Sequence, residues 1–177
     1  MHIKLRWACF MVIGTLLSAC MSDPYDTGID AIISTNRAAA NNLIRMAGPE
    51  ISPSNNIIAA SFASIDDLSQ SSTFGRVASQ QLTSQFTAAG YSVVEMLLRN
   101  SVYISESQGE FLLSRAVNDI SAQHNAHLVL VGTYAVGENN VFVTAKLIRT
   151  ADSVVIAAHD YALPYTRDMR ILLRQWQ

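Results

Sequence analysis

The spacing of hydrophobic residues predicts three helices along this chain. The first is expected over Asp30–Ala47, where Asp30 caps the start and Gly48-Pro49 ends the helix. The second is capped by Ser72 or Thr73 and is followed by Gly90, which suits the left-handed conformation after a helix. The third is expected to present one apolar side made of Phe111, Leu113, Val117, Ile120 and His124.

Five other segments have patterns typical of strands. Ile57–Ile65 and Tyr91–Leu98 are mainly apolar and favour buried strands. His127–Tyr134 is nearly continuous apolar sequence, which fits a central strand buried on both faces. Val141–Leu147 alternates apolar with other residues, as a strand with two different faces does, and Val154–Leu163 is the last strand expected.

The connections between these segments complete the prediction of fold class. Glu138–Asn140 is expected to form a hairpin turn because asparagine tolerates positive φ, and Thr150–Ser153 to form the next turn. Asp168–Trp176 is expected to form a terminal helix. The order of elements predicts an α/β fold, an α+β sandwich in which a mixed sheet of about four to five strands packs with helices and ends in an antiparallel meander.

The first twenty residues resemble the export signal of a bacterial lipoprotein. Lys4 and Arg6 supply positive charge ahead of an apolar run over Trp7–Leu17, whose 11 residues are too few to span a bilayer. Leu17 to Cys20 resembles a lipobox, in which the cysteine thiol is acylated and the signal is cut before it. Cys20 is therefore the expected lipidation site. The alternative is an ordinary secretory signal in which Cys20 is incidental.

Lipidation at Cys20 would divide the chain into three parts. Residues 1–19 are expected to be the signal peptide, residues 20–29 a tether, and residues 30–177 a single domain. Two or three acyl chains hold a protein on a bilayer almost permanently. The residue after Cys20 is Met21 rather than the aspartate that often retains lipoproteins at the inner membrane, so the outer membrane is the expected location.

The composition of the exported part bears on its partners and its stability. Without Lys4 and Arg6, ten basic residues stand against 14 acidic ones, a net charge of −4. This mild acidity offers no electrostatic footprint for nucleic acid. Cys9 lies in the signal, so Cys20 is the only cysteine left and no intrachain disulfide is expected. Stability must therefore come from packing.

Common catalytic and cofactor-binding motifs have no match in this sequence. His124 and His127 have no third ligand nearby, and His124 suits a cap at a helix C-terminus. Asp66-Asp67 favours a solvated turn over a cation site. Glu110 and Arg115 favour a structural ion pair. The sequence therefore predicts no catalytic residue, no cofactor site and no metal site.

Two blocks of sequence resemble the FlgO domain family. They are the run Gly109, Glu110, Phe111, Leu112, Leu113, Ser114, Arg115 and the run Val131, Gly132, Thr133, Tyr134. Neighbouring segments follow in the family's order, so the resemblance covers about residues 57–165. The family usually has an aspartate after the Ser-Arg pair, where this chain has Ala116, so a contact that this aspartate makes in relatives is missing here.

The resemblance implies a non-enzymatic outer-membrane lipoprotein whose founding relatives support the flagellum where it crosses the outer envelope. The implied partners are the membrane, through the lipid on Cys20, and flagellar ring proteins or other envelope proteins, with homo-oligomers among the expected assemblies. The alternative is an envelope lipoprotein that docks on and regulates a periplasmic enzyme or another secretion or envelope machine. More remotely, the domain resembles the CsgG secretion channel and the LpoB synthase activator. The family-motif residues expected to maintain the fold are Gly109, Glu110, Phe111, Ser114, Arg115, Gly132, Thr133 and Tyr134.

Overall fold

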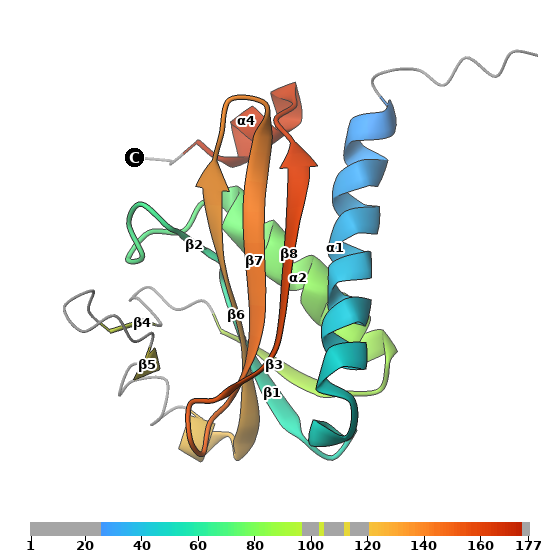
Figure 1. Cartoon of the computed structure of the whole chain (residues 1–177), viewed down its shortest axis with the longest axis vertical. Coiled ribbons are helices and arrows are strands. Elements are labelled where there is room, and N and C mark those ends of the chain that lie inside the picture. Colours follow the sequence, from blue (N-terminus) through green and yellow to red (C-terminus); the bar gives the residue numbers. More distant parts are fainter. Residues whose placement is uncertain (1–25, 97–102, 105–111, 114–120, 175–177) are drawn as a thin grey trace, which may run out of the picture.

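The structure, a computed structural model, describes residues 26–96, 103–104, 112–113 and 121–174. Its first half contains α1 (Asp26–Ala47), η1 (Gly48–Glu50), β1 (Asn56–Ala60), β2 (Ala63–Ser64), α2 (Thr73–Ala88) and β3 (Ser92–Met96). Its second half contains β4 (Tyr103–Ile104), β5 (Leu112–Leu113), β6 (Ala126–Val136), β7 (Asn140–Arg149), β8 (Val155–Pro164) and α4 (Arg167–Leu172) (Figure 1).

The main sheet is mixed, as the sequence predicted. Its strand order is β3-β1-β6-β7-β8, and β2 pairs with the C-terminal part of β6, at Thr133 and Tyr134. The pairs β1–β3, β1–β6 and β2–β6 are parallel, whereas β6–β7 and β7–β8 are antiparallel. The expected C-terminal meander is therefore confirmed. Strands β4 and β5 form a separate antiparallel pair.

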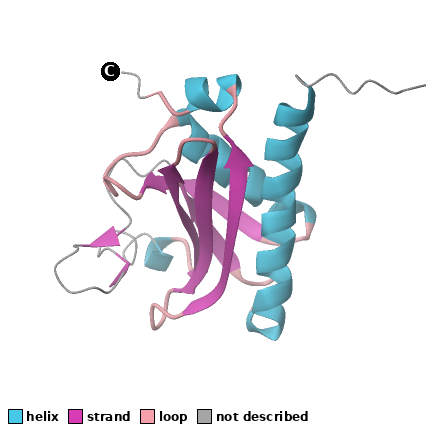
Figure 2. Ribbon diagram, turned by 45° about the horizontal axis from the view of Figure 1, so that its top comes forward, coloured by secondary structure: helices cyan, strands magenta, loops and turns pink. Residues whose placement is uncertain are grey.

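Helices α1 and α2 cover one face of this sheet (Figures 1 and 2). Alternate residues of β6 and β7 point into the main core beneath them, and those residues are Leu128, Leu130, Tyr134, Val141, Val143, Ala145 and Leu147. The intervening residues Val129, Val131 and Ile148 belong to a smaller buried cluster with Ala60. Since alternate residues of a strand point to opposite faces, β6 is buried on both sides, which confirms the prediction of a central strand.

The second predicted helix is confirmed in its ends and in its buried side. The Ser72 hydroxyl caps α2 by accepting a hydrogen bond from the Gly75 amide at 3.2 Å. Gly90, after the helix, has φ +92°, the left-handed conformation expected of it. The apolar stripe packs into the core through Phe74, Ala78, Leu82 and Phe86.

The first strand is shorter than the sequence predicted. Ile57–Ile65 was expected to be continuous, but β1 ends at Ala60 and β2 begins only at Ala63. Between them, the amide of Phe62 donates to the carbonyl of Gly75 at 3.1 Å rather than to a neighbouring strand. This contact with the start of α2 interrupts the sheet ladder, because one amide can satisfy only one strong acceptor.

The prediction for the third helix is wrong at its beginning. Leu112 and Leu113 lie in β5, where they pair with β4, so these two residues are not helical. The described helical residues in this region are 121–123. Asn125, with φ +48°, follows them in the left-handed conformation, so a backbone turn ends this helix. Residues 114–120 lie outside the described part.

Three smaller differences concern helix ends and a turn. Helix α1 begins at Asp26, four residues before the expected cap at Asp30, because extending a formed helix by one turn is easier than starting one. Helix α4 begins at Arg167, with the hydroxyl of Thr166 as its cap. The hairpin after β6 forms as expected, but Asn139 does not use positive φ, and the amide of Gly137 donates to the carbonyl of Asn140 at 2.8 Å.

Candidate functional site

The family-motif residues on β6 lie where the sheet meets the start of α2. Tyr134 is 5% exposed, and its ring meets that of Phe74 edge to face, with centroids 5.3 Å apart. Its carbonyl accepts a hydrogen bond from the amide of Ile65 at 2.9 Å, next to β2. Burial raises the pKa of the Tyr134 hydroxyl above its ordinary value, and hydrogen bonding to Ser72 offsets part of that rise. The hydroxyl therefore stays protonated near neutral pH.

Gly132 provides the space that Phe62 occupies. A Cβ atom at position 132 would come within 2.5 Å of the Phe62 ring carbons. Gly75 of α2 lies equally close to the backbone of Phe62, because a Cβ at position 75 would overlap the carbonyl oxygen of Phe62. The same carbonyl accepts a hydrogen bond from the Ser71 hydroxyl at 2.7 Å. Two glycines therefore let the Phe62 segment lie between β6 and α2.

Thr133 belongs to the opposite face of the sheet. It pairs with Ala63 of β2 on one side and with Thr144 of β7 on the other. The hydroxyl of Thr144 donates to Asp160 of β8 at 2.7 Å. Residues 132–134 therefore contact aromatic rings, hydroxyls and backbone groups of β2, α2 and β7.

A second polar cluster joins α1, α2 and β8 inside the helix layer. Asn36 is 0% exposed, and its carbonyl oxygen accepts from the hydroxyl of Tyr161 at 2.5 Å. Its amide nitrogen donates to the side chain of Gln81 at 2.6 Å. Burial raises the pKa of Tyr161 well above its ordinary value, so its hydroxyl is a donor at physiological pH. The three side chains satisfy one another and fix the relative positions of three elements.

His159 lies two residues before Tyr161 on β8 and contacts the same helix, α1. The guanidinium of Arg45 donates to the side-chain oxygen of Asn42 at 2.7 Å, which fixes the orientation of that amide. The amide nitrogen of Asn42 then donates to Nε2 of His159 at 3.2 Å, and the ring stacks beside Tyr161. The contact between the Asn42 amide and the His159 ring therefore links α1 to β8.

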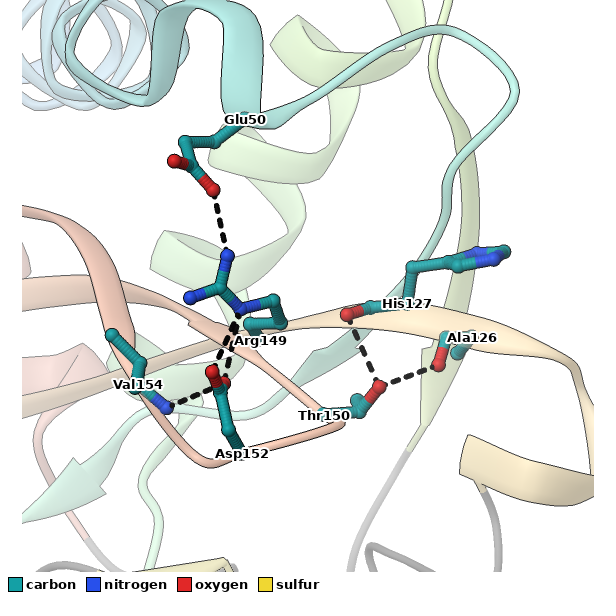
Figure 3. A network of polar contacts seen from close by, with 7 residues as sticks. All are labelled: Glu50, Ala126, His127, Arg149, Thr150, Asp152 and Val154. Carbon is teal, nitrogen blue, oxygen red and sulfur yellow. Dashed lines mark hydrogen bonds and ion pairs between the residues drawn. The ribbon is translucent and has the colours of Figure 1, made fainter.

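Arg149 holds together the end of the domain where β7 turns into β8 (Figure 3). Its guanidinium binds Glu50 at 2.7 Å and Asp152 at 3.0 Å. The hydrogen bond with Asp152 is the main reason that the pKa of Arg149 is raised and that of Asp152 is lowered. The hydroxyl of Thr150 donates to the carbonyls of Ala126 and His127 at 2.9 and 3.1 Å. The side chains of Arg149, Glu50 and Asp152 are partly exposed, so the network fixes a turn at the surface of the domain.

The histidine and aspartate pairs that the sequence singled out are exposed. His124 and His127 lie in the turn before β6 and at its start. Asp67 accepts hydrogen bonds from the amide and hydroxyl of Ser69, at 3.0 and 2.6 Å, and these lower the pKa of its carboxyl. Within the described part of the chain, no three His, Cys, Asp or Glu side chains gather as metal ligands would. The described helices also include none long and apolar enough to cross a membrane.

The remaining site residues predicted from the sequence lie outside the described residues. They are Cys20, Gly109, Glu110, Phe111, Ser114 and Arg115.

One feature of α4 was missed in the sequence. Arg167, Arg170, Ile171 and Arg174 are all exposed, while Met169 between them is buried. Arg167, Arg170 and Ile171 share one side of α4, and Arg174 follows two residues after the helix ends. The close spacing of these arginines could have been found from the sequence Arg167 to Arg174.

Comparison with known families agrees with the resemblance of the two sequence blocks. The family model described as FlgO protein matches residues 37–168, from α1 to the first turn of α4. The chain belongs to the FlgO family. This membership confirms the family predicted from the sequence, and the match covers the whole main sheet, α2 and the second half of α1. Comparison with curated proteins gave no significant match.

Solved structures show which fold the FlgO domain has. The C-terminal domain of LpoB from Escherichia coli is similar with a TM-score of 0.50 and 12% identity, covering 75% of this chain and 97% of that one. The same domain from Salmonella enterica gives 0.48 at 11% identity, covering 72% and 93%. The PelC dodecamer from Paraburkholderia phytofirmans gives 0.47 at 16% identity, covering 66% and 76%. At these identities, the similarity to the Escherichia coli domain concerns the fold alone.

Proposed function

We propose that this protein is an envelope lipoprotein, anchored at the outer membrane by Cys20, that acts as a non-enzymatic structural or assembly component of the flagellar outer-membrane ring. The observation that carries the proposal is the FlgO family match over residues 37–168. The lipobox-like run from Leu17 to Cys20 supports the anchor. The domain would work by docking on ring components or by forming oligomers beside the membrane.

The arrangement of polar groups supports a binding role rather than catalysis. The most deeply buried polar side chain with several partners, Asn36, is satisfied by Tyr161 and Gln81. Tyr134 has a raised pKa and is enclosed by Phe74 and Ser72. Catalytic groups need reach to a substrate and a pKa near the working pH. Asn36, Tyr161 and Tyr134 are enclosed in the fold, and both tyrosines have a pKa raised above 10, so these side chains suit a role in keeping a docking domain rigid.

The length of the tether favours action close to the membrane. Helix α1 begins at Asp26, six residues after Cys20. Six residues span at most about 20 Å when fully extended. A domain attached in this way stays beside the bilayer, where an outer-membrane ring assembles.

The anchor is tested by feeding cells a clickable palmitate analogue and isolating the full-length protein. Label on the wild-type chain and none on Cys20→Ala is the expected result. Membrane fractionation in detergent-free lysate should agree, with the wild type in the outer membrane. A chain that takes up no label and remains in the membrane with alanine at position 20 would contradict the anchor.

A second candidate function is regulation of a periplasmic enzyme such as a peptidoglycan synthase. The fold likeness to the C-terminal domain of LpoB, over 97% of that domain, is the observation in its favour. The two candidates differ in the partner that co-purifies with the detergent-extracted lipoprotein. Ring proteins in the eluate support the first candidate, and a cell-wall synthase without ring proteins supports the second.

A further inference from the structure

The start of α1 and the helix α4 lie at the same end of the domain (Figure 1). His159 of β8 bonds Asn42, and Tyr161, two residues further on, bonds Asn36. Following β8 toward its C-terminus therefore leads along α1 toward its N-terminus. Strand β8 ends at Pro164, directly before α4, and α1 begins at Asp26.

The hairpin between β6 and β7 belongs to this end as well. The amide of Tyr165 donates to the carbonyl of Asn139 at 2.9 Å, which ties the hairpin tip to the segment before α4. The Arg149 network lies at the opposite end of the ten-residue strand β7. The domain thus has two distinct ends, one at α4 and one at the β7–β8 turn.

Helix α4 and the residues directly after it present a basic surface to the solvent. Arg167, Arg170 and Ile171 lie on the helix, and Arg174 lies two residues after its end. Arg167, Arg170 and Arg174 are exposed, and Ile171 among them is 46% exposed. We call these four residues the α4 stripe. Met169 is fully buried on the other side of the helix and holds it against the core.

The charge of the α4 stripe is not neutralised by described carboxylates. Within the described part of the chain, the ion pairs formed by arginine are those of Arg149. The guanidinium carbon of Arg170 lies 5.6 Å over the centre of the Tyr165 ring, a contact that adds no negative charge. Three of the ten basic residues that follow Cys20 fall within the eight positions of the stripe, and the same span contains one acidic residue, Asp168. A local positive surface therefore stands on an acidic protein.

The tether brings this surface to the membrane. The start of α1 lies at the end of the domain that carries α4, and at most about 20 Å of chain joins Asp26 to Cys20. With a lipid on Cys20, the α4 end is held within reach of the headgroups. The β7–β8 turn is held away from them, because α1 alone is 22 residues, roughly 33 Å, long.

We propose that the α4 stripe docks on anionic phospholipid headgroups of the membrane that holds Cys20, with Ile171 entering the interface among three arginines. This inference rests on the proposed lipid anchor. Arginine binds phosphate oxygens through two donors at once, and a basic helix side with an apolar residue is typical of membrane-surface contacts. Docking orients the domain with its α4 end at the membrane and its β7–β8 end facing partners in the periplasm.

A site-specific fluorophore tests this orientation in the lipidated protein. With the signal removed, Cys20 is acylated and no other cysteine remains, so Ile171→Cys introduces a single reactive thiol. Ala151→Cys, in the exposed β7–β8 turn, is the matched control. Each labelled protein is bound to vesicles of phosphatidylcholine, with or without phosphatidylglycerol, that carry a headgroup quencher. We expect quenching at position 171 on anionic vesicles and none at position 151.

Charge substitutions separate docking from anchoring. Each arginine at an anionic surface strengthens binding by about fivefold, so Arg167→Gln, Arg170→Gln and Arg174→Gln together should shift the docking equilibrium roughly a hundredfold. Arg37→Gln with Arg76→Gln, at exposed sites on α1 and α2, should leave quenching unchanged. High salt should also abolish quenching, while flotation of the protein with vesicles persists.

Each outcome decides between the anchor and the docking surface. Protein that floats with vesicles but shows equal quenching at both positions, or equal quenching at position 171 on neutral and anionic vesicles, overturns the docking proposal and leaves the anchor intact. Protein that does not float with any vesicle overturns the anchor itself. Since the substituted arginines are exposed, circular dichroism of the triple variant should match the wild type, and salt titration of the unsubstituted protein gives an independent reading.

Discussion

The ring of Phe62 lies directly over Gly132, in the space where any larger residue would place its side chain. This contact joins the break between β1 and β2 to the centre of β6. It explains why a glycine stands in the middle of a strand, a position that glycine otherwise weakens. The family-motif block is therefore tied to the break between β1 and β2.

We predict that Gly132→Ala destabilises the domain. The new methyl group would meet the Phe62 ring at 2.5 Å, and overpacking of a buried site costs about 1–3 kcal/mol. Urea unfolding should show a lower midpoint with an unchanged slope. Adding Phe62→Leu should recover part of the loss, because a smaller side chain makes room. An unchanged midpoint for the single variant would mean that the two residues do not share this space.

We predict that Ser72→Ala also lowers the free energy of unfolding, by about 1–2 kcal/mol. The hydroxyl caps α2 through the Gly75 amide, so alanine leaves that amide without its partner. It also removes one of the two hydrogen bonds between Ser72 and the hydroxyl of Tyr134 and keeps the one to the Ser72 backbone. Ser84→Ala is the matched control. Its hydroxyl is exposed and donates to a carbonyl within the same helix, so this change should be nearly neutral. Equal effects at both positions would contradict a special role for Ser72.

We predict that Tyr161→Phe costs about 1–3 kcal/mol at neutral pH. Removal of the hydroxyl leaves the side-chain oxygen of Asn36, which is 0% exposed, without its donor. Chemical unfolding of the full-length lipoprotein in detergent measures the loss. Tyr165→Phe is a suitable control because Tyr165 is only partly buried. A Tyr161→Phe variant as stable as the wild type would mean that Asn36 finds another donor.

The same tyrosine predicts a dependence of stability on alkaline pH. Burial raises the pKa of Tyr161 and of Tyr134 above the ordinary value of 10.0 in the folded state. Between pH 10 and the folded-state pKa, the unfolded chain loses these protons and the folded chain keeps them, so stability falls as pH rises. Below pH 10 the contribution of both groups is fully present. Unfolding curves from pH 8 to 11 should show this fall, and Tyr161→Phe should reduce its slope without removing it.

Much of the fold follows from local sequence. Ser72 and Gly90 mark the two ends of α2 because capping and left-handed backbone are properties of single residues and their neighbours. The apolar run of β6 and the alternation of β7 gave the centre and the meander of the sheet for the same reason. These features do not depend on distant parts of the chain.

The features missed depend on contacts between distant residues. Phe62 is apolar and continues a strand pattern, so only its bond to Gly75 and its place over Gly132 reveal the break in the ladder. Leu112 and Leu113 fit a helix as well as a strand, since two apolar residues have no period. The pairing of Asn36 with Tyr161 spans 125 positions and has no local pattern. The α4 stripe, in contrast, was visible in the sequence as arginines at helical spacing.

The central claim is that this FlgO-family protein is a lipid-anchored part of the flagellar outer-membrane ring, and a clean deletion tests it most directly. The deletion strain is scored for swimming, its flagellar bases are imaged by electron cryotomography, and it is complemented with the wild-type gene or with Cys20→Ala. We predict lost or impaired swimming with a missing layer of the outer-membrane ring, restored by the wild type and not by the alanine variant. Normal swimming with intact rings in the deletion strain would contradict the account and direct attention to another envelope machine.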